Sequence, residues 1–403
     1  MGHQMAIGPS QRLYPISIAH AVLRAIAVSP PHLLQIVPSL DGGSLARATI
    51  DAAQAALAAG GSATVASAGG MLVPQLLRLH GKHLELPNDR NPLWARYSLP
   101  TRLFASLRDV EVSVVQARTP ATSWIAQSVA RRLKVKSIAT LHHPFVGNTR
   151  VERFVERRQA QADAMVAVSD HIARDALARL PAVADKLETI KPGINLDRFD
   201  PAGVRAERLI RLAAELRVPD HCHVVICAAR DEPGRLTLIQ AIKQLGRDDV
   251  FCLLLGQTAG MTAFEKELER QIVQADLLGR VQIGPYVEDM PAPYMLADVV
   301  VATGGTRRGF SRALIEAQAM GRPVIAEEGG GAAEAVRPGI TGWLAALADA
   351  GSLAKALETA ISLSVERRAE LARAAQEHAR RHYSLARSNE RLLALYDRLS
   401  GGD

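Results

Sequence analysis

Cysteine is scarce in this chain of 403 residues, and no two cysteines form a Cys-x-x-Cys pair. The three that occur, all in the second half, are Cys222, Cys227 and Cys252. An odd and sparse set argues against a disulfide framework, and its spacing argues against a zinc site built from thiolates. We therefore expect a reducing compartment, of which the cytoplasm is the simplest.

Long apolar segments are also lacking. The longest stretch without a charged residue runs from Ala52 to Leu77, and two glycine pairs and Pro74 interrupt it. Such a segment would break in hydrocarbon rather than span it. The first 30 residues lack the ordered basic, apolar and cleavage regions of a signal peptide. We expect a soluble chain.

Aromatic residues make up only 4% of the chain, and positive charge is unevenly distributed. Residues 1–197 carry 22 Lys and Arg against 14 Asp and Glu, whereas residues 198–403 carry 26 against 27. This asymmetry favours either contact of the first half with an anionic partner or a solvated basic face. Because the basic half lacks aromatic platforms for bases and any recognition motif, we expect no nucleic-acid partner.

Short β-rich apolar runs alternate with alanine-rich segments of helical period throughout the chain. This alternation predicts βαβ units and parallel sheets. The predicted strands of the first half are His32–Pro38, Ser62–Ser67, His83–Pro87, Val112–Gln116, Ser137–Thr140, Met165–Ser169 and Leu187–Lys191. Those of the second half are His223–Ala228, Val250–Leu255, Val281–Ile283, Val299–Ala302, Pro323–Ala326 and Gly342–Leu344. We predict an α/β protein with two doubly wound domains.

The domain boundary is readable in the segment from Lys191 to Pro201, which has a proline near each end and a turn glycine. We place the first domain at residues 1–197 and the second at residues 198–383. Leucines and Tyr396 recur at helical spacing after Ser384, which predicts a docked amphipathic helix. We assign this helix, within residues 384–403, to the first domain.

Ligands of doubly wound sheets bind beyond the carboxyl ends of strands, so loops after strands are the candidate sites. Gly42 and Gly43 follow the first strand and open a helix, where glycine permits close backbone approach and free amides favour anions. A tight turn without ligand fits them equally well. His142 follows another strand, where a neutral imidazole can bind a hydroxyl or orient a reacting group; a structural histidine is the alternative.

Two segments of the second half suit phosphate. Arg230 follows a strand, and its guanidinium matches phosphate oxygens, although a salt bridge to Asp231 or Glu232 is the plainer alternative. The segment from Ala302 to Glu316 combines a strand, a glycine loop and a helix start, which predicts phosphate binding. Within that helix, the Glu316 carboxylate is placed to accept both hydroxyls of a ribose.

From about His32 to Leu399 the chain resembles the family 4 retaining glycosyltransferases of the GT-B fold, in which two Rossmann-like domains face each other across a cleft. The likeness is greatest to bacterial members that build lipopolysaccharide and related surface glycans. The motifs that carry it are the double-glycine loop, Ala139-Thr140-Leu141-His142, Ala167-Val168-Ser169, the linker Lys191–Phe199, Gly309-Phe310-Ser311, Glu316–Ala326, Gly329-Gly330-Gly331 and Thr341-Gly342-Trp343-Leu344.

The resemblance implies transfer of a sugar from a nucleotide-diphosphate donor to a glycan or glycolipid acceptor, with retention at the anomeric carbon. It implies no cofactor and no essential metal. The second domain would hold the donor. Glu316 matches the glutamate on the ribose, Gly309, Phe310 and Ser311 match the loop on the donor's sugar and phosphates, and Arg230 matches the basic residue on the diphosphate.

On the first domain, the resemblance assigns Gly42 and Gly43 to a loop that roofs the donor phosphates. It assigns His142 to the histidine beside the transferred sugar. A leaving diphosphate accumulates negative charge, so arginines, helix amides and glycine loops around it lower the barrier electrostatically.

The chain departs from the family at two donor-site charges. The family places a lysine about six residues after the position of Arg230, and here Arg235 is the nearest cation. It also places a glutamate where this chain has Arg308. We expect Arg308 either to replace the lost charge at the phosphates or to pair with an acidic donor sugar. Loss of one preorganised phosphate contact can raise a barrier by about 2.7–4 kcal/mol.

The sequence therefore predicts a glycosyltransferase with an altered donor pocket. The alternative is a catalytically silent relative that binds a nucleotide or glycan as a partner protein, and an epimerase on the same fold is a more distant one. The basic first domain predicts reversible peripheral attachment to the anionic inner face of the cell membrane. We expect a cytoplasmic location otherwise.

Overall fold

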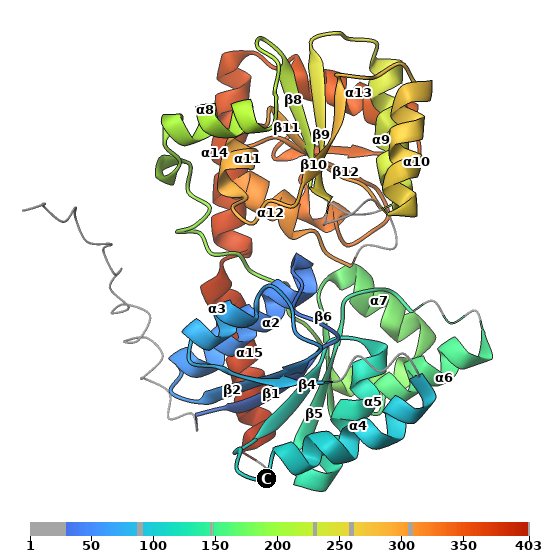
Figure 1. Ribbon diagram of the computed structural model, residues 1–403, viewed down its shortest axis with the longest axis vertical. Coiled ribbons are helices and arrows are strands. Elements are labelled where there is room, and N and C mark those ends of the chain that lie inside the picture. The colour runs from blue at the N-terminus through green and yellow to red at the C-terminus, as the bar shows by residue number, and fades with distance from the viewer. Residues whose placement is uncertain are drawn as a thin grey trace, which may run out of the picture.

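A computed structural model describes residues 30–86, 92–145, 147, 149–228, 232–257, 262–304 and 309–401 of the chain. Figure 1 shows two domains, one above the other, with the N-terminal domain below. Each domain is built on one parallel sheet with helices packed around it.

The N-terminal sheet has seven strands in the order β3-β2-β1-β4-β5-β6-β7, and all its pairs are parallel. The strands are β1 His32–Ile36, β2 Ser62–Ser67, β3 Lys82–Glu85, β4 Val114–Ala117, β5 Lys136–Leu141, β6 Ala164–Ala167 and β7 Leu187–Thr189. The helices that follow them are α2 Gly43–Ala58, α3 Val73–Arg78, α4 Pro92–Ser106, α5 Pro120–Leu133, α6 Arg150–Gln159 and α7 Asp170–Arg179.

The C-terminal sheet has six strands in the order β10-β9-β8-β11-β12-β13, again all parallel. The strands are β8 His223–Cys227, β9 Val250–Gln257, β10 Val281–Pro285, β11 Val299–Ala302, β12 Val324–Glu327 and β13 Gly342–Ala345. The helices are α8 Ala206–Glu215, α9 Glu232–Leu245, α10 Ala263–Gln274, α11 Pro291–Leu296, α12 Arg312–Ala319, α13 Ala350–Ile361, α14 Val365–His382 and α15 Leu385–Ser400.

The predicted α/β fold with two doubly wound domains is confirmed. All thirteen predicted strands are present, with ends within two residues of the prediction. Strand β7 ends at Thr189 rather than Lys191 because only three of its residues pair with β6. Helix α15 begins at Leu385 rather than Ser384, since the Ser384 hydroxyl accepts a hydrogen bond from the Arg387 amide and caps the helix.

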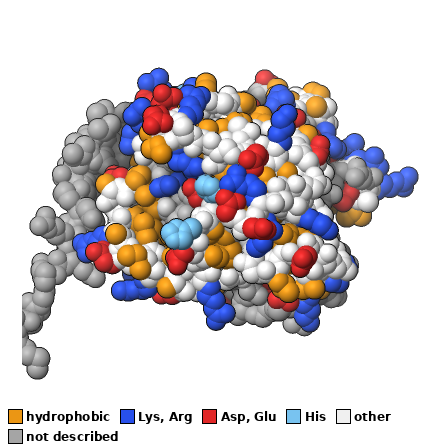
Figure 2. Space-filling model, turned by 90° about the horizontal axis from the view of Figure 1, so that it is seen from above, with side chains coloured by type: hydrophobic (Ala, Val, Ile, Leu, Met, Phe, Trp, Pro, Cys, Tyr) orange, Lys and Arg blue, Asp and Glu red, His pale blue; other side chains and the backbone are white. Residues whose placement is uncertain are grey.

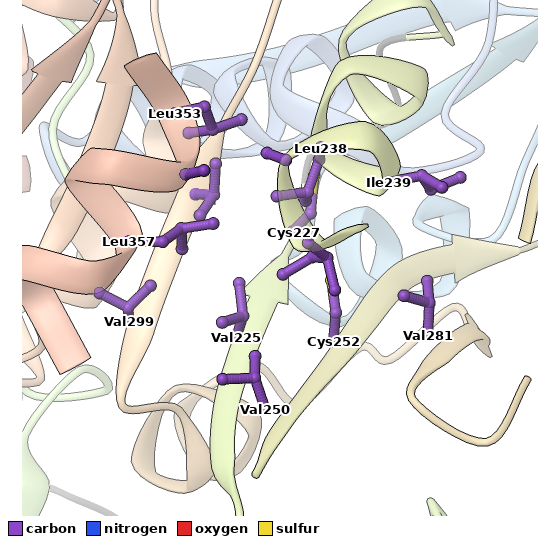
Figure 3. Close-up of a cluster of buried hydrophobic side chains, with 14 of the residues drawn as sticks. Val225, Cys227, Leu238, Ile239, Val250, Cys252, Val281, Val299, Leu353 and Leu357 are labelled. Carbon is purple, nitrogen blue, oxygen red and sulfur yellow. The ribbon is translucent and has the colours of Figure 1, made fainter. Parts of the chain in front are cut away.

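One of the two cores of the C-terminal domain lies between its sheet and helices α9 and α13, and the other lies on the opposite face, against α12. Figure 3 shows Val225, Cys227 and Cys252 on the strands facing Leu238 and Leu357 on the helices. Both cysteines are fully buried and act as small apolar side chains. Burial raises the pKa of the Cys252 thiol, which therefore stays neutral in this core.

The chain crosses between the domains twice, and the two crossings are hydrogen-bonded to each other. The Ile194 amide donates to the Tyr383 carbonyl at 2.9 Å, and the Leu385 amide donates to the Ile194 carbonyl at 2.8 Å. After the second crossing α15 packs beneath the N-terminal sheet, where Leu393 and Tyr396 join its core. The C-terminal helix α15 thus contributes to the core of the N-terminal domain.

Charge on the outer face of the C-terminal domain is mixed. Figure 2 looks onto this domain from above and shows Lys and Arg interspersed with Asp and Glu. That pattern agrees with the near balance of charge in residues 198–403. In the described part of the chain, no helix combines the length and the apolar character needed to cross a bilayer.

Candidate functional site

A cleft of about 590 Å³ lies between the two domains. Its size falls within the range of small-molecule sites, about 300–1,000 Å³. The N-terminal domain contributes α2, and the C-terminal domain contributes Ala228 after β8, the carboxyl end of β9, the loop after β10 and the start of α12. These loops follow strand ends, because parallel strands place their carboxyl ends at one edge.

The glycine pair after β1 forms part of this cleft. Gly43 lines it, and Gly42 has a φ of 102°, a conformation that favours glycine. A Cβ added at Gly42 would lie 3.1 Å from the Tyr286 hydroxyl, which belongs to the loop after β10. The pair therefore brings backbone of one domain close to a side chain of the other.

The start of α12 faces the same cleft. Phe310 and Ser311 line it just before the helix, and the Ser311 side chain makes no capping hydrogen bond. The amides of the first turn are therefore not satisfied by a cap, and they suit an anionic ligand.

Glu316 lies one turn into α12 with its carboxylate held by two neighbours. The Tyr294 hydroxyl donates to Glu316 Oε2 at 2.9 Å, and Arg312 Nε lies 3.5 Å from Glu316 Oε1. Burial, and next the charge of Glu316, raise the pKa of the Tyr294 hydroxyl well above its usual value. Tyr294 therefore remains a hydrogen-bond donor to the carboxylate at any physiological pH.

Arg312 also forms an ion pair across the cleft. Its Nη1 lies 2.6 Å from Oδ2 of Asp51, which is on α2 of the other domain. The exposed fractions of the two side chains are 11% and 22%. Burial alone would lower the pKa of Arg312, but the carboxylates of Asp51 and Glu316 outweigh it and raise that pKa. One guanidinium thus joins both domains.

Two further arginines line the cleft, but they are held less tightly. Arg47 on α2 approaches Glu288 at 3.9 Å, and Glu288 is 67% exposed. Arg198 of the linker donates through Nη2 to the Glu288 carbonyl at 2.6 Å. These cations add positive potential to the cleft at the side nearest the linker.

His142 and His143 follow β5, and they line different cavities. His143 lines the main cleft, whereas His142 lines a second cavity of about 40 Å³. Burial first, then the charges of Arg118 and His143, lower the pKa of His142 to about 3. The imidazole is therefore neutral at physiological pH.

Gly309 holds the two domains in backbone contact. A Cβ added at Gly309 would lie 2.0 Å from the His142 carbonyl oxygen, and one added at Gly331 would lie 1.8 Å from the Gly309 carbonyl oxygen. No side chain fits at either position without movement of the backbone. The glycine loops of the C-terminal domain therefore pack directly onto the strand end that carries His142.

Glu334 forms a second contact between the domains. Its carboxylate accepts hydrogen bonds from the amides of Asp170 and His171 at the start of α7, and it pairs with Lys191 at 3.2 Å. A carboxylate at a helix start is stabilised by the free amides and the helix dipole. Opening the cleft would break these bonds.

Of the three arginines predicted at the diphosphate, the structure describes only Arg235. Arg235 is buried at 3% exposure and donates to the Leu255 carbonyl; it is not among the residues that line the main cleft. Its role at the diphosphate stays a prediction. Arg230 and Arg308 lie outside the described residues.

Two family models match adjacent parts of the chain. The model described as Glycosyltransferase Family 4 matches residues 45–198, and the model described as Glycosyl transferases group 1 matches residues 222–362. Each match falls within one of the two sheet domains. Together the two matches support the superfamily of GT-B glycosyltransferases that includes group 1 and family 4.

Solved GT-B structures share the whole architecture. A glycosyltransferase from Rickettsia africae superposes with a TM-score of 0.82, at 24% identity, over 93% of this chain and 100% of that one. Anabaena Alr3699/HepE in complex with UDP and glucose superposes with a TM-score of 0.81, at 21% identity, over 92% and 100%. At such identities the likeness shows the fold alone.

Among curated relatives, the D-inositol 3-phosphate glycosyltransferase of Salinispora tropica is 33% identical over 258 residues. The match covers 60% of this chain and 52% of that protein. The chain thus spans about half the length of the relatives it matches. They carry a different name from the lipopolysaccharide enzymes that the motifs suggested.

Sequence reasoning missed Tyr294, Asp51 and Arg118 in this GT-B site. Tyr294 lies on a six-residue helix with no motif around it. Asp51 lies on α2 outside its buried positions, so from the sequence its carboxylate resembles an ordinary surface charge. Arg312 lies in the segment predicted as a helix start. Its charge next to the apolar residues that follow was a signal that could have identified it as a functional residue.

Proposed function

We propose that the protein transfers a sugar from a nucleotide-diphosphate sugar to an acceptor with retention of anomeric configuration. The observation that carries this proposal is that Gly43, Phe310, Ser311 and Glu316, four residues assigned to the donor by resemblance, line one cleft between two GT-B domains. The complex of HepE with UDP and glucose has the same fold, which supports a nucleotide-sugar donor.

In this proposal the donor lies against the C-terminal domain. Glu316, oriented by Tyr294 and Arg312, accepts the ribose hydroxyls. The amides at the start of α12 face the diphosphate and stabilise the charge that develops on the leaving group. His142, which the resemblance assigns to the transferred sugar, is neutral but lines the smaller cavity beside this cleft rather than the cleft itself. Arg230, Arg235 and Arg308 keep their proposed roles at the diphosphate.

We infer two candidate acceptors. The motifs favour a lipopolysaccharide or other surface glycan, whereas the name of the curated relatives favours a phosphorylated cyclitol. Both present hydroxyls to the cleft and both commonly carry phosphate. Transfer assays with each acceptor class separate the candidates.

We also propose a cytoplasmic enzyme that attaches reversibly to the inner face of the cell membrane. Helix α6 supports this, because Arg150, Arg153 and Arg157 are exposed beside Val151 and Phe154. Basic and apolar side chains on one helix suit an anionic lipid surface. Co-sedimentation with vesicles of anionic lipid, lost at high salt and absent with neutral lipid, is the expected result.

The decisive experiment is a donor screen with purified full-length protein. UDP-, GDP- and ADP-sugars are supplied with each acceptor class, and the anomeric configuration of the product is read by NMR. Glu316→Gln should lose nucleotide affinity, whereas Glu288→Gln, an exposed carboxylate on the same cleft, should not. If none of UDP, GDP and ADP binds at millimolar concentration in calorimetry, the proposal is wrong.

We propose that the transfer needs no cofactor and no metal, as the resemblance implies. Turnover in excess EDTA should equal turnover in magnesium. A protein that binds nucleotide tightly but turns over no donor would instead match the silent binding partner.

A further inference from the structure

The cavity of about 40 Å³ adjoins the main cleft. The two share Asp51, Arg312 and Leu385 as lining residues, so they meet at the ion pair between the first two. At about 10–15 Å³ for each water, its volume admits roughly three waters, which is the size of a small oxyanion group.

Arg118 lies in this cavity with its charge uncompensated. The residue is 5% exposed and follows β4. Its Nε and Nη2 donate to Gln35 Oε1 at 3.2 and 3.0 Å, and Nη2 also donates to the Ala48 carbonyl at 3.0 Å. Among the described residues, no carboxylate pairs with Arg118 and nothing bonds to Nη1. A buried guanidinium without a counter-ion costs several kcal/mol.

His142 presents a second unpartnered nitrogen to the same cavity. Its Nε2 is buried and has no hydrogen-bond partner in the described part of the chain. Two other polar side chains of the wall are paired: Gln116 donates to Thr140 Oγ1 at 2.8 Å, and its Oε1 accepts from the Tyr396 hydroxyl at 2.6 Å. Buried polar atoms are rarely left unpaired, so His142 Nε2 points to a ligand, and the Arg118 guanidinium on the same cavity favours an anion.

We propose that this cavity binds an oxyanion group, a phosphate or a carboxylate, carried by the acceptor. The inference rests on the proposed transferase function. Arg118 and Arg312 supply two positive charges to the cavity wall, and Asp51 supplies one negative charge. An oxyanion therefore meets a net positive site, and Asp51 is already neutralised by Arg312.

The geometry also sets the orientation of that acceptor. The anionic group pairs with Arg118 and accepts a hydrogen bond from His142 Nε2, in the tautomer that carries the proton there. The rest of the acceptor then extends past Asp51 into the main cleft, toward the donor site at Glu316. An anchored oxyanion would hold a nucleophilic hydroxyl in position for transfer.

The test is calorimetry of the full-length protein with inorganic phosphate, with and without saturating UDP. We expect phosphate to bind in both conditions, since the site is separate from the donor site. Arg118→Gln should weaken phosphate at least 20-fold, and Arg118→Lys should give an intermediate value. Arg131→Gln, on the exposed face of the neighbouring helix α5, is the matched control and should bind as the parent does.

Complete displacement of phosphate by UDP, or equal binding by Arg118→Gln, would overturn the inference. If Arg118→Gln fails to fold, Arg118→Lys and His142→Gln carry the same comparison. A second arm asks whether phosphate competes with glucose 6-phosphate but not with glucose. Competition supports an oxyanion carried by the acceptor, and phosphate binding without competition would refute that part. Calorimetry needs no turnover, so a failed donor screen leaves this result readable.

Discussion

The ion pair between Asp51 and Arg312 is expected to set how tightly the two domains close. It joins helices of different domains at 2.6 Å, and both side chains are mostly buried. A hydrogen bond to a charged group contributes about 1.5–3 kcal/mol, whereas an exposed pair contributes about 0–1 kcal/mol. Asp51→Asn should therefore destabilise the closed arrangement of the two domains, relative to the open one, by about 1.5–3 kcal/mol.

This loss should appear in nucleotide affinity, because the pair can form only when the cleft is closed. At 1.4 kcal/mol for each factor of ten, UDP should bind about 10- to 150-fold more weakly to Asp51→Asn. Arg312→Gln should lose more, since it also removes a neighbour of Glu316 and leaves Asp51 without a cation. The assay is calorimetry with UDP, together with the melting temperature of each variant.

Glu288→Gln provides the control, because its pair with Arg47 also crosses the domains but is 3.9 Å long and exposed. It should change UDP affinity by less than about fivefold. The double variant Asp51→Asn with Arg312→Gln should be less impaired than the sum of the single losses, as contacting residues are coupled. Additive losses, or an Asp51→Asn protein with unchanged affinity, would refute the reasoning.

Three other changes test the junction around His142. Gly309→Ala places a methyl 2.0 Å from the His142 carbonyl and should lower the melting temperature, whereas Gly203→Ala, which meets nothing within 4 Å, should not. Because the pKa of His142 is lowered to about 3, its contribution to stability is complete above pH 6.5 and is lost as the pH falls from 6.5 toward 3, by up to about 1.4 kcal/mol for each pH unit. Denaturant midpoints measured against pH should show that slope in the parent and a flatter one in His142→Gln; equal slopes would contradict it. Tyr294→Phe removes the donor to Glu316 and should weaken UDP about tenfold in calorimetry, and an unchanged affinity would show that the bond does not orient the carboxylate.

The fold could be predicted from the sequence because its signals are local. Buried parallel strands appear as short apolar runs, and the turns between them carry glycine or proline. The strand Val299–Ala302 was predicted with the bounds that the structure gives it. The start of the last helix is less sharply marked, since Ser384 caps α15 rather than belonging to it.

The donor-side residues could be predicted because they follow strand ends in one domain. The pairs that join the domains could not. Asp51 and Arg312 are separated by 261 positions, and nothing local to either residue reveals the other. No motif marks Arg118 either. What makes it a candidate is that it is buried without an ion-pair partner among the described residues, and only the structure shows this. Such features depend on the relative placement of two domains, which periodicity does not encode.

Two kinds of contact join the domains: backbone hydrogen bonds at the crossings and charged side-chain contacts between the domains. The two crossings near Ile194 and Tyr383 are bonded to each other and stay together as the domains rotate. Charged contacts also hold the domains closed, Arg312 with Asp51 and Glu334 with the start of α7, and Glu334 lies beside the crossings, since its carbonyl accepts from the Tyr383 hydroxyl. Water can replace each of these bonds when the cleft opens, so the net cost of opening is a few kcal/mol. A ligand that contacts both domains supplies a differential affinity of that size, which is sufficient to shift the closed population.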